Sequence, residues 1–214
     1  MMRQRLARLV LAALTTAPLG AAPQHGRLFP PEQLGMLEGP DRDAWQRPDQ
    51  IMDKLLIAEG SVVADIGAGG GWFTMRLANR VGPNGTVYAE DVQSQMIDAI
   101  TRRTGRAGLK NVKTVLGTSS DPRLPAPVDA VLFNDAYHEF EHPVVMLGNV
   151  VKALKPNGRI GIVEFKKDGL GPGPPMEERL DPERVIRDAE AAGLRLVSRE
   201  NFPRYLYMLV FSRQ

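Results

Sequence analysis

The chain has 214 residues, 43% of them hydrophobic, and its 27 basic and 25 acidic residues give a formal net charge of +2. This length and apolar content suit one α/β domain with a short extension. The nearly balanced charge gives no overall attraction to nucleic acid or acidic membranes, and the absence of cysteine excludes disulfides, thiol catalysis and cysteine-ligated metals.

The first 22 residues differ in character from the rest. Three arginines precede the apolar run Leu9–Leu14, and small residues follow at positions 20–22. This order is typical of a secretory signal peptide cleaved near Ala21 or Ala22, and the apolar run is too short to span a bilayer. We therefore expect a signal peptide over 1–22 and a periplasmic or secreted protein. The alternative is a non-signal extension or a misassigned start codon on a cytoplasmic protein.

The next segment leads into the domain. Residues 23–42 are rich in Pro and Gly and are expected to form a linker or arm ahead of a domain over 43–214. Apolar spacing from Asp43 to Leu56 predicts a helix that Pro48 interrupts. The helix is therefore expected to begin near Pro48, with Arg47 in an extended conformation.

From residue 62 onward, short apolar runs alternate with helical patterns. Strands are predicted over 62–66, 86–90, 112–116, 130–134, 159–165, 194–199 and 205–211, and helices over 72–81, around 96–100, over 144–154 and over 181–193. This alternation predicts a mostly parallel sheet with helices on both faces. The last connection is too short for a crossover helix, so the last strand should run antiparallel.

The most informative stretch is 62–71, a short apolar strand that ends in a glycine-rich turn before the helix over 72–81. A strand, a glycine turn and a helix open a nucleotide-binding βαβ unit, so the fold class is α/β with a Rossmann-like, doubly wound seven-stranded sheet. The dinucleotide fingerprint needs glycine where this chain has Trp72. Asp65 would repel a pyrophosphate but suits a cationic amine, so the turn fits an amino-acid-bearing nucleoside.

Four stretches resemble, in their order and spacing, the class I S-adenosylmethionine-dependent methyltransferases. They are Val62–Gly71, Val87–Asp91, Val128–Asp135 and Leu154–Arg159, within a resemblance that covers roughly residues 40–214. The resemblance implies a seven-stranded sheet, S-adenosylmethionine as the cofactor and methyl transfer as the reaction. It says little about which molecule accepts the methyl group.

The resemblance also implies which residues hold the cofactor, at the carboxyl ends of the first four strands. Asp65 would receive the methionine ammonium and Asp91 the ribose hydroxyls, while the neighbouring Glu90 should point to the opposite side. The expected cofactor-binding residues are Asp65, Gly67, Ala68, Gly69, Gly71, Asp91, Thr118, Ser119 and Asn134.

The adenine contact departs from the pattern of the resemblance. Thr118 stands where many relatives carry an acid that meets the adenine amine. Thr118, Ser119 or Asp121 would supply that contact, or the segment is only a turn at Asp121 and Pro122.

Residues 138–142 match H-E-x-x-H, the signature of zinc proteases, in which two histidines share one face of a helix. Here the motif closely follows a buried strand and precedes Pro143, which leaves little room for a helix. Zinc hydrolysis through His138, Glu139 and His142 is therefore a remote alternative, and no metal is expected. We expect Asp135 and His138 to be catalytic, positioning the nucleophile or removing its proton, with ordinary loop packing as the alternative.

The acceptor region is expected to include the helix around 45–56 and the loop 166–178. Trp45, Phe165, Met176 and the prolines of that loop would form a partly apolar lid over a small, possibly lipophilic acceptor. No nucleic acid partner and no stable membrane span are expected. Because the cofactor is made in the cytosol and a signal peptide implies export, a non-catalytic binding module on a methyltransferase scaffold is the alternative function.

Overall fold

The computed structural model describes residues 28–202 and 204–214, so the expected signal peptide lies outside the described residues. The elements in chain order are η1 (Pro31–Leu37), α1 (Arg42–Gln46), α2 (Pro48–Lys54), β1 (Val62–Ile66), α3 (Trp72–Val81), β2 (Thr86–Asp91), α4 (Ser94–Arg106), β3 (Val112–Leu116), β4 (Val128–Asn134), η2 (Tyr137–Glu139), α5 (Pro143–Ala153), β5 (Leu154–Phe165), α6 (Pro182–Ala191), β6 (Leu194–Glu200) and β7 (Leu206–Arg213). No helix in this part of the chain has the length and apolar character needed to cross a bilayer.

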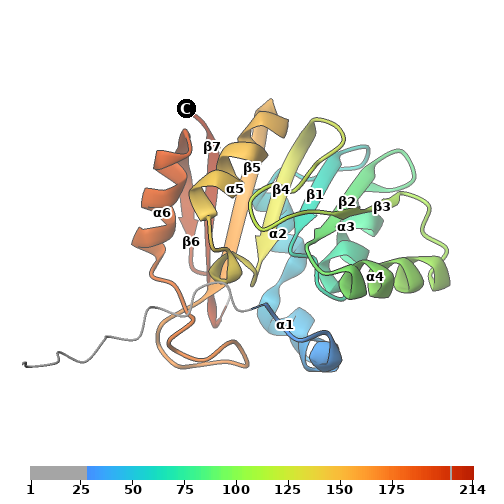
Figure 1. Ribbon diagram of the computed structural model, residues 1–214, viewed down its shortest axis with the longest axis horizontal. Helices are drawn as coiled ribbons and strands as arrows, with labels where there is room; N and C mark the ends of the chain where they lie inside the picture. Colours follow the sequence, from blue (N-terminus) through green and yellow to red (C-terminus); the bar gives the residue numbers. More distant parts are fainter. Residues whose placement is uncertain (1–27, 203) are drawn as a thin grey trace, which may run out of the picture.

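The seven strands form one sheet in the order β3-β2-β1-β4-β5-β7-β6 (Figure 1). Strands β1 to β5 pair in parallel, whereas β7 runs antiparallel to both β5 and β6. The expected α/β fold with a reversed last strand is confirmed. The strand order changes direction between β1 and β4, and ligands of such sheets bind beyond the carboxyl ends of the strands at this switch point.

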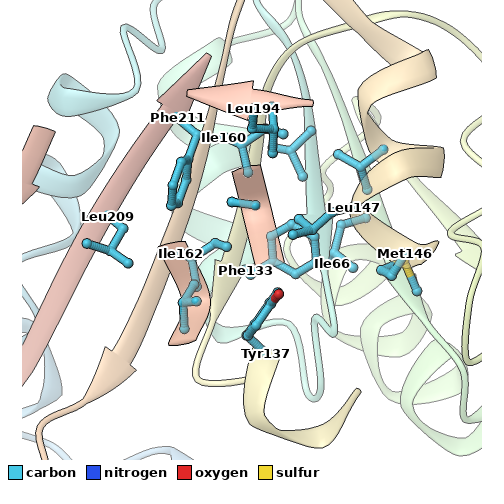
Figure 2. Packing of buried hydrophobic residues seen from close by; sticks show 14 of the residues in the cluster. Ile66, Phe133, Tyr137, Met146, Leu147, Ile160, Ile162, Leu194, Leu209 and Phe211 are labelled. Carbon is cyan, nitrogen blue, oxygen red and sulfur yellow. The ribbon is translucent and has the colours of Figure 1, made fainter. Parts of the chain in front are cut away.

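Two apolar layers cover the two faces of the sheet. One layer joins α5 and α6 to the central strands through residues that include Phe133, Ile162 and Phe211 (Figure 2). The other layer packs α2 and α3 against the opposite face, with Ile51 and Leu77 fully buried. Helices on both faces leave the strand ends as the place where polar residues can gather.

Strand β4 shows how its sequence produces this arrangement. Val131 and Phe133 belong to the first apolar layer, while Ala130 and Leu132 belong to the second. Successive side chains of a strand point to opposite faces, so a strand covered on both faces is a continuous apolar run. The run ends at Asn134, where the strand reaches its carboxyl end.

In the segment before β1, α2 begins at Pro48 as expected, but two features differ from the prediction. A short helix, α1, precedes α2, and Arg47 between them adopts a left-handed conformation with φ +53° instead of an extended one. Pro48 disfavours a right-handed helical conformation at the preceding residue, which explains the break. Residues 31–37 of the expected linker form the 3-10 helix η1.

Candidate cofactor and acceptor site

A cavity of about 450 Å³ lies at the carboxyl ends of β1, β2 and β4. Its walls are the glycine turn after β1, the ends of β2 and β4, the segment around η1, η2 with its neighbouring residues, and part of the loop between β5 and α6. Figure 1 shows α1 and this loop, drawn in orange, at the same edge of the sheet. Segments that are far apart in the sequence therefore enclose one space.

The glycine turn forms the floor of the cavity. Gly67 has φ +68°, and a Cβ atom placed on it would lie 2.6 Å from the Cβ atom of Ala136. Gly69 has φ +54°, and the nearest atom to a Cβ placed there is Cδ1 of Leu37 at 3.8 Å. The backbone at Gly67 is thus confined by the protein itself, whereas the space above Gly69 is open to a ligand.

Of the four predicted residues in the glycine turn, Gly67, Ala68 and Gly69 line the cavity and Gly71 does not. Gly71 lies at the N-cap of α3 with φ +80°, and a Cβ atom there would lie 3.2 Å from Cγ1 of Ile100. Gly71 therefore allows α3 to begin with a left-handed residue and to pack closely against α4.

Both acids at the end of β2 line the cavity. Asp91 Oδ2 accepts a hydrogen bond from the Gly69 amide at 3.0 Å, and Asp91 Oδ1 accepts one from the Gln93 amide at 2.9 Å. Glu90 does not point away, contrary to expectation: its Oε2 accepts a hydrogen bond from the Gly67 amide at 3.3 Å. The glycine turn folds across the strand end, so its amides reach both carboxylates.

Burial disfavours the charged forms of Asp91 and Glu90. Burial raises the pKa of Asp91, and burial followed by repulsion from Asp91 raises the pKa of Glu90 well above its usual range. Glu90 Oε1 is buried and has no hydrogen-bond partner among the described residues. A buried acceptor without a donor costs about 1–3 kcal/mol, and protonation of Glu90, which its raised pKa favours, reduces that cost.

Asp65 lies in β1 and borders the same cavity. Its Oδ2 accepts a hydrogen bond from Thr74 Oγ1 at 2.6 Å, and both side chains are buried. Burial raises the pKa of Asp65 to about 6, although the Thr74 hydrogen bond and the charge of Arg42 oppose that shift. A cationic ligand would relieve the cost of this buried carboxylate.

The three candidates for the adenine contact differ in their positions. Thr118 forms a closed turn with Asp121: its Oγ1 accepts a hydrogen bond from the Asp121 amide at 2.9 Å, and its own amide donates to the Asp121 carbonyl at 2.9 Å. Neither of these two residues lines the cavity, whereas Ser119 does. The turn uses the hydroxyl of Thr118, so Ser119 is the polar side chain that remains for a ligand on this side.

Asn134 lines the cavity and is hydrogen-bonded to a side chain of α1. Its Oδ1 accepts a hydrogen bond from Nε2 of Gln46, whose Oε1 in turn accepts one from Nε of Arg42 at 3.1 Å. The Arg42 guanidinium lies 4.2 Å from the centroid of the Trp72 ring, an attractive cation–π contact. Burial lowers the pKa of Arg42, and the charge of Asp135 opposes that shift. Arg42 and Gln46 were not predicted from the sequence.

Asp135, His138 and Glu164 form a cluster near the carboxyl ends of β4 and β5, in which His138 and Glu164 are buried and Asp135 is partly buried. His138 Nδ1 lies 2.9 Å from Glu164 Oε2 and 3.9 Å from Asp135 Oδ1. The Tyr137 amide donates a hydrogen bond to Glu164 Oε1 at 2.7 Å. The structure thus brings together the two predicted catalytic residues, and it adds Glu164 from β5, which was not predicted.

The cluster also shifts the protonation of its members. Burial alone would lower the pKa of His138, but the charge and hydrogen bond of Glu164, with the charge of Asp135, raise it to about 10. Burial raises the pKa of Asp135 to about 7, with repulsion from Glu164 in the same direction and attraction to His138 and Arg42 opposing it. The directions of these shifts favour the charged form of His138 and the protonated form of Asp135.

The H-E-x-x-H residues do not form a zinc-protease site. His138 and Glu139 lie in η2, whereas the exposed His142 is the N-cap of α5, so no helix presents the two histidines on one face. Asp135, His138 and Glu164 do place one potential ligand atom each within 4.8 Å of one another. The His138 and Glu164 atoms of that set are engaged with each other in a hydrogen bond.

The loop after β5 contributes part of the apolar wall of the cavity. Pro172, Gly173, Pro174 and Pro175 line the cavity, as expected of an acceptor lid, whereas Met176 does not. Trp45 and Phe165 pack against each other with their ring centroids 5.9 Å apart, and neither lines the cavity. These two rings support the loop from outside the cavity wall.

The segment around η1 covers the glycine turn. Gln93 Nε2 donates a hydrogen bond to the Phe29 carbonyl at 3.0 Å, and Arg103 on α4 pairs with Glu38. Leu34 and Leu37 line the cavity from this side. The expected linker is therefore part of the site, a role that its Pro- and Gly-rich composition does not indicate.

Comparison with known proteins shows what the chain resembles. Residues 57–196 match the family model described as a methyltransferase domain. Nocamycin O-methyltransferase from Saccharothrix syringae is 31% identical over 140 residues, which cover 64% of this chain and 48% of that protein. An uncharacterised methyltransferase of Mycobacterium tuberculosis (strain ATCC 25618 / H37Rv) is 35% identical over 122 residues, covering 56% of this chain and 46% of that protein.

Among solved structures, the crystal structure of a SAM-dependent methyltransferase from Aquifex aeolicus superposes with a TM-score of 0.81 at 28% identity. That match covers 87% of this chain and 100% of the other. The chain spans about half the length of the curated relatives that it matches. The region matched by the family model includes β1 to β5 and all of the predicted cofactor-binding residues, whereas β7 lies beyond it.

Proposed function

The chain belongs to the methyltransferase-domain family, and we propose that it transfers a methyl group from S-adenosylmethionine to a small, partly apolar molecule. The observation that carries the proposal is the arrangement of the cavity floor. An open glycine turn lies between a buried acid at the end of β1 and two buried acids at the end of β2.

The residues of the cavity fit this cofactor. The Asp91 carboxylate lines the cavity and accepts hydrogen bonds from backbone amides at both oxygens, and a carboxylate has about four lone-pair sites, so it can also accept from a ribose hydroxyl. Asp65 offers a buried negative charge for the ammonium of the methionine part. The open space over Gly69 accepts the close approach of the ligand, and a volume of about 450 Å³ falls within the range of small-molecule sites.

S-adenosylmethionine supplies a methyl group on a sulfonium, which is already an activated leaving group. The contribution of the protein is therefore mainly to hold the acceptor in line and to exclude water. The prolines of the loop after β5 give the apolar wall against which an acceptor rests. Asp135 and His138 also line the cavity and act on the proton of the acceptor.

The experiment is a calorimetric titration of the full chain with S-adenosylmethionine and with its demethylated product, S-adenosylhomocysteine. We expect micromolar binding of both compounds, and a loss of at least tenfold in affinity in Asp91→Asn, because the amide removes a charged acceptor of hydrogen bonds. Asp98→Asn is the matched control, since Asp98 is exposed on α4 and does not line the cavity.

The outcomes separate the two functions. Binding of neither compound contradicts the proposed enzyme and favours a non-catalytic module on the same scaffold. Equal loss of affinity in Asp91→Asn and Asp98→Asn contradicts the assignment of the ribose contact.

A further inference from the structure

We propose that the Asp135, His138 and Glu164 cluster recognises a hydroxyl group, so that the methyl acceptor is an oxygen nucleophile such as a phenol, an enol or an alcohol. The inference rests on the proposed function and deepens it by naming the acceptor class. In this site Asp135 takes the hydroxyl proton, His138 donates a hydrogen bond to the hydroxyl oxygen, and Glu164 is a positioning residue.

Glu164 fixes the orientation of His138. The Glu164 side chain is fully buried in β5, and each of its oxygens has a partner: Oε1 accepts from the Tyr137 amide and Oε2 is bound to His138 Nδ1. A carboxylate held at both oxygens cannot turn away from the imidazole. With Nδ1 engaged, Nε2 is the ring nitrogen that remains for a ligand, and His138 lines the cavity.

Asp135 supplies an unused acceptor. Its Oδ1 atom is buried and has no hydrogen-bond partner among the described residues. The residue adopts φ +55°, in the left-handed region that non-glycine residues uncommonly occupy, and its amide donates a hydrogen bond to the Val163 carbonyl at 2.8 Å. Asp135 lines the cavity, and a ligand that donates a proton to Oδ1 would relieve the cost of a buried acceptor without a donor.

The charges around the pair support these two roles. The groups that act on His138 are Glu164, Asp135 and Glu139, which are all acidic, and those that act on Asp135 are His138, Glu164, Arg42 and Arg179. The raised pKa of His138 keeps it a donor at both ring nitrogens, and the pKa of Asp135 lies where it takes up a proton near neutrality.

A donor beside an acceptor selects oxygen over nitrogen. A hydroxyl gives its proton to Asp135, accepts from His138 with one lone pair and keeps another for the methyl group. Proton transfer converts the carboxylate into a carboxylic acid and the hydroxyl into an oxyanion, which the imidazolium stabilises, so charge is conserved. A neutral amine has one lone pair, and a hydrogen bond from His138 would occupy the electrons needed for attack.

The test uses nuclear magnetic resonance of the histidine rings in the full chain, which contains only three histidines. We expect the pKa of His138 to be raised by Glu164, and to fall by more than one unit in Glu164→Gln, which keeps the size of the side chain. Glu177→Gln is the matched control, since Glu177 is exposed and does not line the cavity. A His138 pKa that is unchanged in Glu164→Gln would overturn the positioning role.

Phenol and aniline then test the acceptor class, because they have the same shape and differ in the reacting atom. With S-adenosylhomocysteine present, we expect phenol to shift the His138 signals with at least fivefold higher affinity than aniline. The preference should disappear in Asp135→Asn. Equal responses to the two probes, or no response to either, would overturn the hydroxyl site. The calorimetric titration tests cofactor binding independently of this result.

A titration with Mn²⁺ tests whether the cluster of Asp135, His138 and Glu164 binds a metal ion instead of a hydroxyl group. Micromolar binding that broadens the His138 signals and is lost in Glu164→Gln would overturn the proposal, since the cluster would then be a metal centre. Absence of such binding supports a site that works through protons alone.

Discussion

Replacing Gly69 with alanine separates the cost of folding from the cost of binding at the cavity floor. A left-handed conformation costs a residue with a Cβ atom about 1–2 kcal/mol relative to glycine. At Gly69 the added Cβ would meet only Leu37 Cδ1 at 3.8 Å, an ordinary contact, so we expect no steric term beyond this strain. In a protein of this size, that loss lowers the melting temperature by about 2–8 °C.

Gly60 provides the matched control. It has φ +82°, it is exposed, and a Cβ atom there would meet nothing within 4 Å. Gly60→Ala and Gly69→Ala should therefore lower the melting temperature by similar amounts in the absence of ligand. Only Gly69→Ala places a methyl group in the open space that we assign to the cofactor, so it alone should weaken binding, by about tenfold or more.

The assay is thermal unfolding followed by calorimetric titration with S-adenosylhomocysteine for both variants. If Gly69→Ala binds as tightly as Gly60→Ala, the ligand does not lie over the glycine turn and the reasoning is refuted. If Gly69→Ala unfolds far below Gly60→Ala, the space over Gly69 is not open in the free protein.

Two further predictions concern the buried acid of β1. The raised pKa of Asp65 means that the folded protein binds more protons than the unfolded chain between about pH 4 and pH 6, so this group makes unfolding easier as pH rises through that window. Cofactor affinity should rise with pH in the same window, because the ligand ammonium pairs with the charged form of Asp65. Titrations at each pH should show the affinity falling by up to about tenfold for each pH unit below pH 6. A flat pH profile, or a profile that is unchanged in Asp65→Asn, would contradict this role of Asp65. In Thr74→Val, loss of the 2.6 Å hydrogen bond to Asp65 should destabilise the fold by about 1–3 kcal/mol. It should also move the midpoint of the pH profile of cofactor affinity upward, because the hydrogen bond lowers the pKa of Asp65. A midpoint that moves downward would show that the hydrogen bond does not favour the carboxylate.

Much of the fold was predictable because the signals are local. The apolar runs give the strands, and the N-cap of α6 follows from Asp181, whose side chain accepts a hydrogen bond from the Glu183 amide at 3.1 Å. The glycine turn was equally visible, since its spacing and its neighbouring acid are contiguous in the sequence. These features depend on short stretches of chain and little on tertiary contacts.

The missed parts of the site depend on contacts between distant segments. Glu164 lies in the buried second half of β5, whose other residues from Ile160 to Phe165 are apolar, and the only signal that could have marked it is a charge in a run expected to be buried. Glu90 was assigned to the wrong side because strand alternation does not account for a turn that folds back over the strand end. The cover formed by η1 depends on contacts such as that of Gln93 with Phe29, which lie far apart in the sequence.

A crystal structure of the full chain with S-adenosylhomocysteine would show whether the glycine turn and the acids of β1 and β2 hold the cofactor. We expect the ribose hydroxyls within hydrogen-bond distance of the Asp91 carboxylate and the amino group of the ligand beside Asp65. Density for the ligand elsewhere, or an Asp91 side chain turned away from the sugar, would contradict this expectation.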